Sequence, residues 1–330
     1  MKRSVKPLLI GTGIAALGMV AAGAASAVAT GSLVKIAMDR QLPRRYRHGE
    51  KGRTRLTGSP ADLVMLQTLA DAGKKLRSAG CEPLYLTAGD GTRLMGHWRP
   101  ASEPKRVILA MHGWRSSWDR DFGVIADFWH DAGCSVLFAE QRGQGSSGGE
   151  YMGFGMTEQY DCLDWVRLIN EKTGGKLPIY LGGVSMGATT VLMASGLPMP
   201  VNVRGVIADC GFTSPKAIWK HVAKHNLHLP YGPRAGLVDA LCRRRIHMAS
   251  GDHSTVDALR KTKLPVLLIH GDADSFVPVE MTYENFQACG SPKKLLVVPG
   301  AGHGGSYLKD PGGYRQALLD FWRENDTRTV

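Results

Sequence analysis

Residues 177–192 read LPIYLGGVSMGATTVL, and of the whole sequence this stretch indicates the fold most clearly. The apolar run at 177–181 is typical of a buried strand, and the run after Gly187 favours a helix. Between them Ser185 stands in GVSMG, with a glycine two residues away on each side. A serine held clear of a sheet on a tight strand-to-helix turn needs small neighbours at these positions, because larger ones would clash. The stretch therefore predicts a strand–serine–helix unit with Ser185 as the candidate nucleophile.

Short apolar runs alternate with helical stretches on both sides of this unit. This alternation predicts an α/β fold with a mostly parallel central sheet covered by helices on both faces. Residues 81–100, with Gly-Asp-Gly at their centre, predict an antiparallel hairpin that enters the sheet. The strand-like runs lie at 106–111, 134–139, 177–181, 203–208, 265–270 and 294–298, and helices are predicted at 157–169 and 188–195.

More than fifty residues separate the strand predicted near 208 from the strand predicted at 265. A connection this long inside an α/β domain usually serves function. We expect a small helical cap at about 212–262, over the strand ends where such sheets bind ligands. The cap carries His221, His225 and His228, but no cysteine or carboxylate stands at matching spacing, so we expect no metal site.

A serine nucleophile needs a base, and the base needs an acid that orients it. His303 lies in GAGHGG after the run at 294–298, where flanking glycines let a loop bring an imidazole close to another backbone. Asp274 lies in HGDADSFVP, which begins as the run at 265–270 ends. Two rivals for the acid stay open: Asp272 in the same loop, and Asp209 at the end of the preceding strand.

The oxyanion of an acyl-transfer reaction needs two preorganised N–H donors. The backbone N–H of Met186, directly after the nucleophile, is the first candidate. The second is expected in the loop after an early strand, where MHGWR spans 111–115, and we choose the backbone N–H of Trp114. His112 and His270 each precede a glycine at a strand end, and we expect them to shape loops.

The four motifs HGW, GVSMG, HGDADxxVP and GAGH resemble those of the α/β-hydrolase superfamily in both order and position. EQRGQGS at 140–146 looks like that family's DxRGxGxS loop, with Glu140 in place of the usual aspartate. The stretch 140–165 is similar to membrane-anchored bacterial serine hydrolases, close to serine aminopeptidases and monoacylglycerol-lipase-like esterases. The resemblance implies Ser185 as nucleophile, Asp274 as acid and His303 as base, with Trp114 and Met186 as oxyanion donors and no cofactor.

The N-terminal segment carries three basic residues and then 28 uncharged residues, from 7 to 34. About 20 apolar residues suffice to cross a bilayer as a helix, so the length favours a membrane anchor. A basic run at 35–51 follows and resembles a juxtamembrane segment. The alternatives are a signal peptide cleaved after Ala27, giving a secreted protein, and an ordinary buried helix, which the charge-free length disfavours. We expect an anchor and basic segment at 1–50 in the cell membrane, with its orientation left open, and a hydrolase domain at 51–330.

The net charge of +12 does not indicate nucleic-acid binding. Residues 1–60 hold eleven Lys or Arg against two acidic residues, whereas the other 270 hold 30 basic and 27 acidic residues. A nucleic-acid footprint should lie on the folded domain, which is close to neutral. The six cysteines form no CxxC pair, which argues against a disulfide scaffold and a zinc site.

These features predict hydrolysis of a small or lipid-like carboxylic ester through a Ser-His-Asp triad and an acyl-enzyme. Amide or peptide cleavage and thioester hydrolysis or acyl transfer stay open, because one fold and one triad serve all of them. A membrane-tethered binding module without activity is disfavoured, since no member of the triad is missing.

Overall fold

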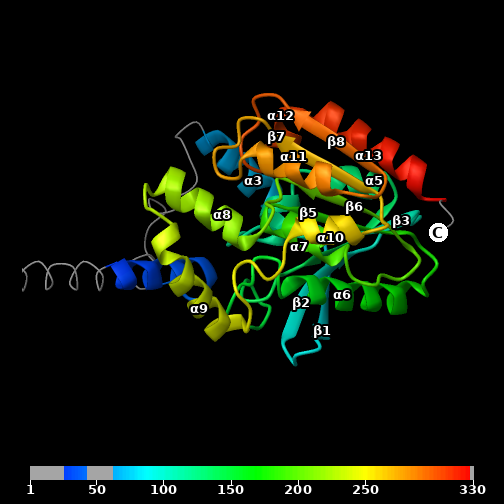
Figure 1. Ribbon diagram of the computed structural model, residues 1–330. Helices are drawn as coiled ribbons and strands as arrows, with labels where there is room; N and C mark the ends of the chain where they lie inside the picture. The colour runs from blue at the N-terminus through cyan, green and yellow to red at the C-terminus, as the bar shows by residue number, and fades with distance from the viewer. Residues whose placement is uncertain (1–25, 43–61, 328–330) are drawn as a thin grey trace, which may run out of the picture.

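The computed structural model describes residues 26–42 and 62–327, and a twisted sheet forms its centre (Figure 1). Its eight strands lie in the order β1-β2-β4-β3-β5-β6-β7-β8. They are β1 (Glu82–Thr87), β2 (Arg93–Arg99), β3 (Arg106–Met111), β4 (Cys134–Ala139), β5 (Ile179–Val184), β6 (Val203–Asp209), β7 (Val266–Gly271) and β8 (Lys293–Val298).

The strand directions confirm the predicted fold class. The first two strands form the predicted antiparallel hairpin, and β2 joins β4 antiparallel. The other five pairings are parallel: β4 with β3, β3 with β5, β5 with β6, β6 with β7 and β7 with β8. Met111 at the end of β3 pairs with both Ala139 and Gly183, so three strands end level with one another. The loops after the parallel strands therefore gather at one edge, where they can bring side chains together.

Two apolar layers cover the two faces of the sheet, and strands such as β3, β4 and β7 are fully buried between them. In β3, Val107 and Leu109 point into one layer, and Ile108 points into the other, as the two-residue period of a strand requires. The first layer is built with α6 (Glu158–Thr173), α7 (Met186–Ala194), α10 (Thr255–Lys261) and α11 (Val279–Ala288). The second is built with α3 (Asp62–Arg77), α4 (Trp118–Phe122), α5 (Ala126–Asp131), α12 (Ser306–Lys309) and α13 (Pro311–Asn325).

Helices occupy the region predicted as a cap. They are α8 (Pro215–His221), a π-helical turn (Val222–Asn226), a 3-10 turn (Gly232–Arg234) and α9 (Ala235–Ile246), followed by α10, which returns to the sheet. A third apolar cluster joins α8 and α9 to Phe154 and to Met186. Because Met186 directly follows β5, this cluster lies beyond the carboxyl end of that strand. The division of the chain into domains stays a prediction.

A helix at residues 26–38, here called the N-terminal helix, packs against this third cluster beside α9 (Figure 1). Its buried residues Thr30, Val34 and Met38 recur every four positions and so lie on one face. Residues 7–25 of the predicted anchor lie outside the described residues. Among the residues that the structure describes, none of the helices is both long and apolar enough to span a bilayer.

Candidate active site

Ser185 lies on the turn between β5 and α7, in a backbone conformation that favours glycine (φ 56°, ψ −118°). Non-glycine residues at positive φ are strained and persist where the surroundings fix them. The flanking glycines explain how this turn fits. A Cβ on Gly187 would lie 1.8 Å from the carbonyl oxygen of Met111, and one on Gly183 would lie 2.3 Å from Gly187. The GxSxG spacing is therefore a packing requirement, as the sequence predicts.

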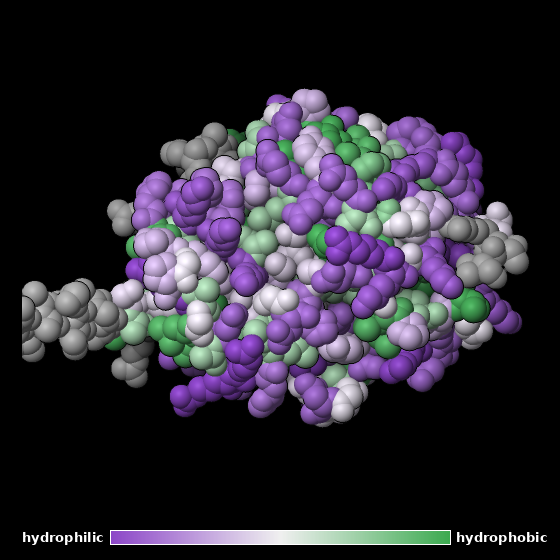
Figure 2. Space-filling model, viewed as in Figure 1, coloured by the Kyte–Doolittle hydropathy of each residue, from purple (hydrophilic) through white to green (hydrophobic). Residues whose placement is uncertain are grey.

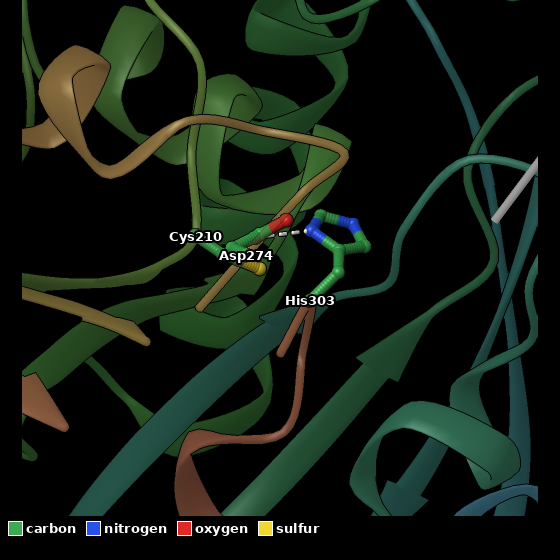
Figure 3. Close-up of side chains that lie close together, drawn as sticks. All are labelled: Cys210, Asp274 and His303. Atoms are coloured by element: carbon green, nitrogen blue, oxygen red, sulfur yellow. Dashed lines mark hydrogen bonds and ion pairs between the residues drawn. The ribbon is translucent and has the colours of Figure 1, made fainter. Parts of the chain in front are cut away.

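The structure brings Ser185, His303 and Asp274 together in one hydrogen-bonded chain. Ser185 Oγ lies 2.9 Å from His303 Nε2, and His303 Nδ1 lies 2.7 Å from Asp274 Oδ2. Figure 3 shows the second of these bonds, between the loop after β7 and the loop after β8. The pattern fits a neutral imidazole that donates from Nδ1 and accepts at Nε2. The His303 side chain is 24 % exposed, so the ring can reach a substrate from one side.

Four donors surround the buried carboxylate of Asp274. Oδ1 accepts the backbone N–H groups of Phe276 and Val277, each at 2.9 Å, and Oδ2 accepts from His303 and from His270 Nε2 at 3.1 Å. Burial alone would raise the pKa of Asp274, but the charge of His303 and the bonds from both histidines outweigh it. That pKa is held well below its usual range, so Asp274 is ionised at neutral pH.

Neither rival carboxylate bonds to His303. Asp272 is exposed and accepts the backbone N–H of Gly300 at 2.6 Å, which ties two loops together. Asp209 is buried and accepts a hydrogen bond from Ser306 Oγ at 3.1 Å, and burial raises its pKa to about 6. The geometry therefore favours Asp274 over both.

His270 makes a contact that the sequence does not reveal. It does shape the loop after β7, because its Nε2 lies 2.9 Å from the carbonyl oxygen of Val277. It is also fully buried and donates from Nε2 to Asp274, while its Nδ1 lies 2.6 Å from Thr282 Oγ1. Only its place four residues before Asp274 hints at the contact with Asp274, and that spacing across a strand end has no fixed geometry. His112 does shape a loop, because its Nε2 accepts the backbone N–H of Gln141 at 3.1 Å.

A buried thiol adjoins the pair of Asp274 and His303 (Figure 3). Cys210, at φ 50° after β6, offers a sulfur within 4.8 Å of ligand atoms of both residues. Three such groups could hold a soft metal ion, but the aspartate and histidine are already bonded to each other. Burial raises the pKa of Cys210 to about 11, so the sulfur is protonated at neutral pH.

The protonation of His303 follows from the same neighbours. Burial alone would lower the pKa of His303, but the proximity of Cys210 and Asp274 outweighs this and raises that pKa well above its usual value. Since Cys210 is protonated at neutral pH, Asp274 supplies the negative charge. The imidazolium form of His303 is thus stabilised.

The loop of residues 113–117, here called the oxyanion loop, passes close to Ser185. A Cβ built on Gly113 would lie 3.4 Å from Cβ of Ser185 and 3.3 Å from Oδ2 of Asp121. Among the described residues, the backbone N–H groups of Trp114 and Met186 donate to no protein acceptor. Both N–H groups predicted as oxyanion donors are therefore without a protein acceptor in the described part of the chain.

Glu140, which replaces the family's usual aspartate, lies apart from this chain of bonds. Its carboxylate contacts His97 Nε2 at 2.7 Å and accepts the backbone N–H of Ser146. It therefore folds its own loop and does not alter the geometry at Ser185.

Comparisons with known proteins agree with the fold. The family model for serine aminopeptidases (S33) matches residues 102–230, and that for TAP-like proteins matches 232–325. Uncharacterized protein YqkD of Bacillus subtilis is 29% identical over 191 residues, which are 58% of this chain and 63% of YqkD, slightly under two thirds of its length. The bifunctional esterase/perhydrolase DCH of Acinetobacter calcoaceticus is 24% identical, with 67% of this chain and 92% of that protein covered.

Solved structures show the same architecture. An esterase of Pyrococcus furiosus, Pf2001, superposes with a TM-score of 0.63 at 22% sequence identity, covering 76% of this chain and 94% of the esterase. Hydrolysis is the class of activity that the family models and relatives support. With this sheet order, these loops and these matches, the chain belongs to the α/β-hydrolase superfamily.

Proposed function

We propose that this protein is a serine hydrolase that cleaves carboxylic esters, with Ser185 as nucleophile, His303 as base and Asp274 as the acid that orients the base. The observation that carries the proposal is the unbroken chain of bonds from Ser185 Oγ through the imidazole to Asp274, at 2.9 and 2.7 Å. Such a chain activates a hydroxyl that is otherwise a weak nucleophile.

In the first half-reaction Ser185 Oγ attacks the acyl carbon while its proton passes to His303 Nε2. The carbonyl oxygen becomes an oxyanion, which accepts hydrogen bonds from the backbone N–H groups of Trp114 and Met186. Met186 opens α7, so the positive end of that helix also faces the new charge. The tetrahedral intermediate then collapses: the bond to the alcohol breaks, and His303 gives its proton to the alcohol oxygen.

Water completes the cycle through the same groups. His303 Nε2 takes a proton from water, and the resulting hydroxide adds to the acyl carbon. The bond to Ser185 Oγ then breaks, the serine oxygen regains the proton from His303, and the carboxylic acid leaves. Asp274 keeps the imidazole in one tautomer and stabilises its charged form throughout, without accepting the proton.

Apolar and aromatic side chains around the nucleophile favour a lipophilic acyl chain. Phe276 packs edge-on against His303 with ring centroids 5.1 Å apart. The ring of Phe154 packs against the rings of Trp219 in α8 and of Trp114, with ring centroids 5.0 and 6.3 Å apart. These rings belong to or pack against the third apolar cluster, which also contains Met186. Burying apolar substrate surface against them contributes about 25 cal/mol per Å².

The match to serine aminopeptidases favours a second candidate, the hydrolysis of aminoacyl amides. We expect the ester reaction to dominate. A series of p-nitrophenyl esters of rising chain length, run beside aminoacyl p-nitroanilides, separates the two. Ester turnover that increases with chain length and disappears in Ser185→Ala supports the proposal. Turnover of the anilides alone would assign the protein to peptide chemistry instead.

The N-terminal segment supports a membrane location as a separate proposal. Residues 7–34 are uncharged, and Val28 of the N-terminal helix is 71% exposed. Figure 2 shows a largely hydrophilic face with a hydrophobic patch where this helix meets α9. Full-length protein that stays with membranes after alkaline washing would support the tether, and release by washing would refute it.

A further inference from the structure

The oxyanion loop is held from two sides, and only one side belongs to the same part of the chain. On the near side Asp121 of α4 accepts the backbone N–H of Gly113 at 2.7 Å and the hydroxyl of Ser116 at 2.5 Å. These bonds hold the first residue of the loop, Gly113, and a residue near its end, Ser116. Trp114 and Arg115, which lie between them, are held by residues more than seventy positions earlier in the sequence.

The far side consists of residues 36–40, here called the N-terminal collar, at the end of the N-terminal helix. The indole N–H of Trp114 donates to the carbonyl of Ala37 at 2.8 Å. The Arg115 guanidinium donates to the carbonyl of Ile36 at 2.7 and 3.1 Å and to that of Asp39 at 2.6 Å. The last carbonyls of a helix lack partners within it and carry the negative end of its dipole. The two loop residues therefore cap this helix.

The collar does not depend on the oxyanion loop for its own position. Met38 is fully buried in the third cluster, and its carbonyl accepts the backbone N–H of Met152 at 2.7 Å. The backbone N–H of Arg40 donates to the backbone carbonyl of Glu150 at 2.8 Å. The Asp39 carboxylate lies 2.7 Å from Arg245 Nε in α9, and both side chains are mostly buried. The collar is thus joined to the cap and to a second loop, and can serve as a fixed support.

The backbone of Arg115 shows why the loop needs this support. It has φ 49°, a strained conformation that a residue other than glycine keeps only where its surroundings impose it. The N–H of Trp114 belongs to the peptide that joins Gly113 to Trp114, which is separated only by the Cα of Trp114 from the peptide that carries the N–H of Arg115. A shift at Arg115 therefore reaches the candidate donor through the backbone of Trp114.

We propose that Trp114 and Arg115, through their bonds to the N-terminal collar, are positioning residues that aim the oxyanion donor at the substrate. The inference rests on the proposed function, since it needs an oxyanion beside Ser185. It also makes residues 36–40, which precede the predicted hydrolase domain, part of the catalytic unit.

The test uses the full chain with Arg115→Lys and Trp114→Phe. Lysine keeps the charge but cannot span the carbonyls of Ile36 and Asp39. Phenylalanine keeps an aromatic ring but removes the indole N–H together with part of the indole. We expect each to lower kcat on p-nitrophenyl butyrate by about 10–100-fold with little change in KM, because the bonds act on the transition state. An alkylboronic acid, which forms a tetrahedral adduct on the serine, should bind more weakly by a similar factor.

Arg106→Lys is the matched control. Arg106 is the first residue of β3, the strand that precedes the oxyanion loop. It is buried and donates hydrogen bonds to Asp326 and to the carbonyl of Ala132. Its replacement should lower the midpoint of thermal unfolding but leave kcat and boronate affinity unchanged. Unchanged kcat and boronate affinity in both loop variants, in a protein whose Ser185 is reactive, would overturn the inference. An unreactive wild type would instead refute the proposed function, and the inference with it.

Discussion

The two sides of Ser185 are built in different ways. On one side His303 and Asp274 lie in loops after the neighbouring strands β8 and β7, and short glycine-containing motifs in the sequence predict both residues. On the other side the oxyanion loop depends on the N-terminal collar, 77 positions before Trp114 in the case of Ala37. Proton transfer is therefore encoded locally at strand ends, whereas charge stabilisation depends on a distant piece of chain. Substitutions on the two sides should differ in size and in the quantity they change.

Breaking the proton-transfer side should have the largest effect. We expect His303→Ala and Ser185→Ala each to lower kcat by about 10⁶-fold, because members of such a chain act as a unit. For the same reason the double variant should be no slower than either single variant. Steady-state turnover of a p-nitrophenyl ester measures this, and losses that multiply would show that the two residues act independently.

Asp274→Asn should lower kcat by about 10⁴-fold, because an amide no longer holds the imidazole in the productive tautomer. Asp272→Asn and Asp209→Asn are matched controls, since neither carboxylate bonds to His303. Comparing kcat for the three variants checks the assignment. A loss as large in Asp209→Asn as in Asp274→Asn would move the acid to the end of β6.

Removing the collar should have an intermediate effect. Deletion of residues 1–25 leaves every described bond of the collar in place, and we expect unchanged kcat for a soluble ester. Deletion of 1–42 removes the collar carbonyls that accept hydrogen bonds from Trp114 and Arg115, and kcat should fall by about 10–100-fold. Circular dichroism establishes that both proteins are folded. Equal kcat in the two would show that Asp121 alone holds the loop.

The smallest effect is a shift in pH dependence. His303 must be neutral to act as the base, and its pKa is raised chiefly by the neighbouring Asp274 charge. Activity should therefore increase with pH to a plateau, with a midpoint above the usual histidine pKa of about 6.5. Asp274→Asn should move that midpoint down, and Cys210→Ser should not. A profile of kcat/KM against pH measures both, and an unshifted midpoint in Asp274→Asn would contradict the assigned cause.

The same pKa sets an opposite trend for stability. Because the folded-state pKa of His303 is raised, its contribution to stability is complete below the unfolded pKa of about 6.5. The contribution is lost as the pH rises through the folded-state pKa. The protein therefore becomes more active as this stabilisation decreases, and thermal unfolding of wild type and Asp274→Asn across this range should differ less at high pH.

The contrast between the two sides of Ser185 also explains which features of the site can be predicted from the sequence and which cannot. Ser185, Asp274 and His303 follow apolar strands, so a two-residue period and a few glycines suffice to place them. The N-terminal helix begins in a stretch that carries no charge up to Val34, so Val34 and Met38 do not stand out as a buried face. Length alone then favours a membrane anchor. The bond from His270 to Asp274 cannot be predicted from the sequence, because the fold of the loop after β7, and not the spacing of the two residues, brings them together.

Covalent labelling tests directly whether Ser185 is an activated nucleophile. A fluorophosphonate reacts with an activated serine, and the modified peptide can be located by mass spectrometry. The account predicts one modification, at Ser185, that is lost in Ser185→Ala and strongly slowed in His303→Ala and Asp274→Asn. Folded wild-type protein that stays unmodified, or a modification at another serine, would contradict it.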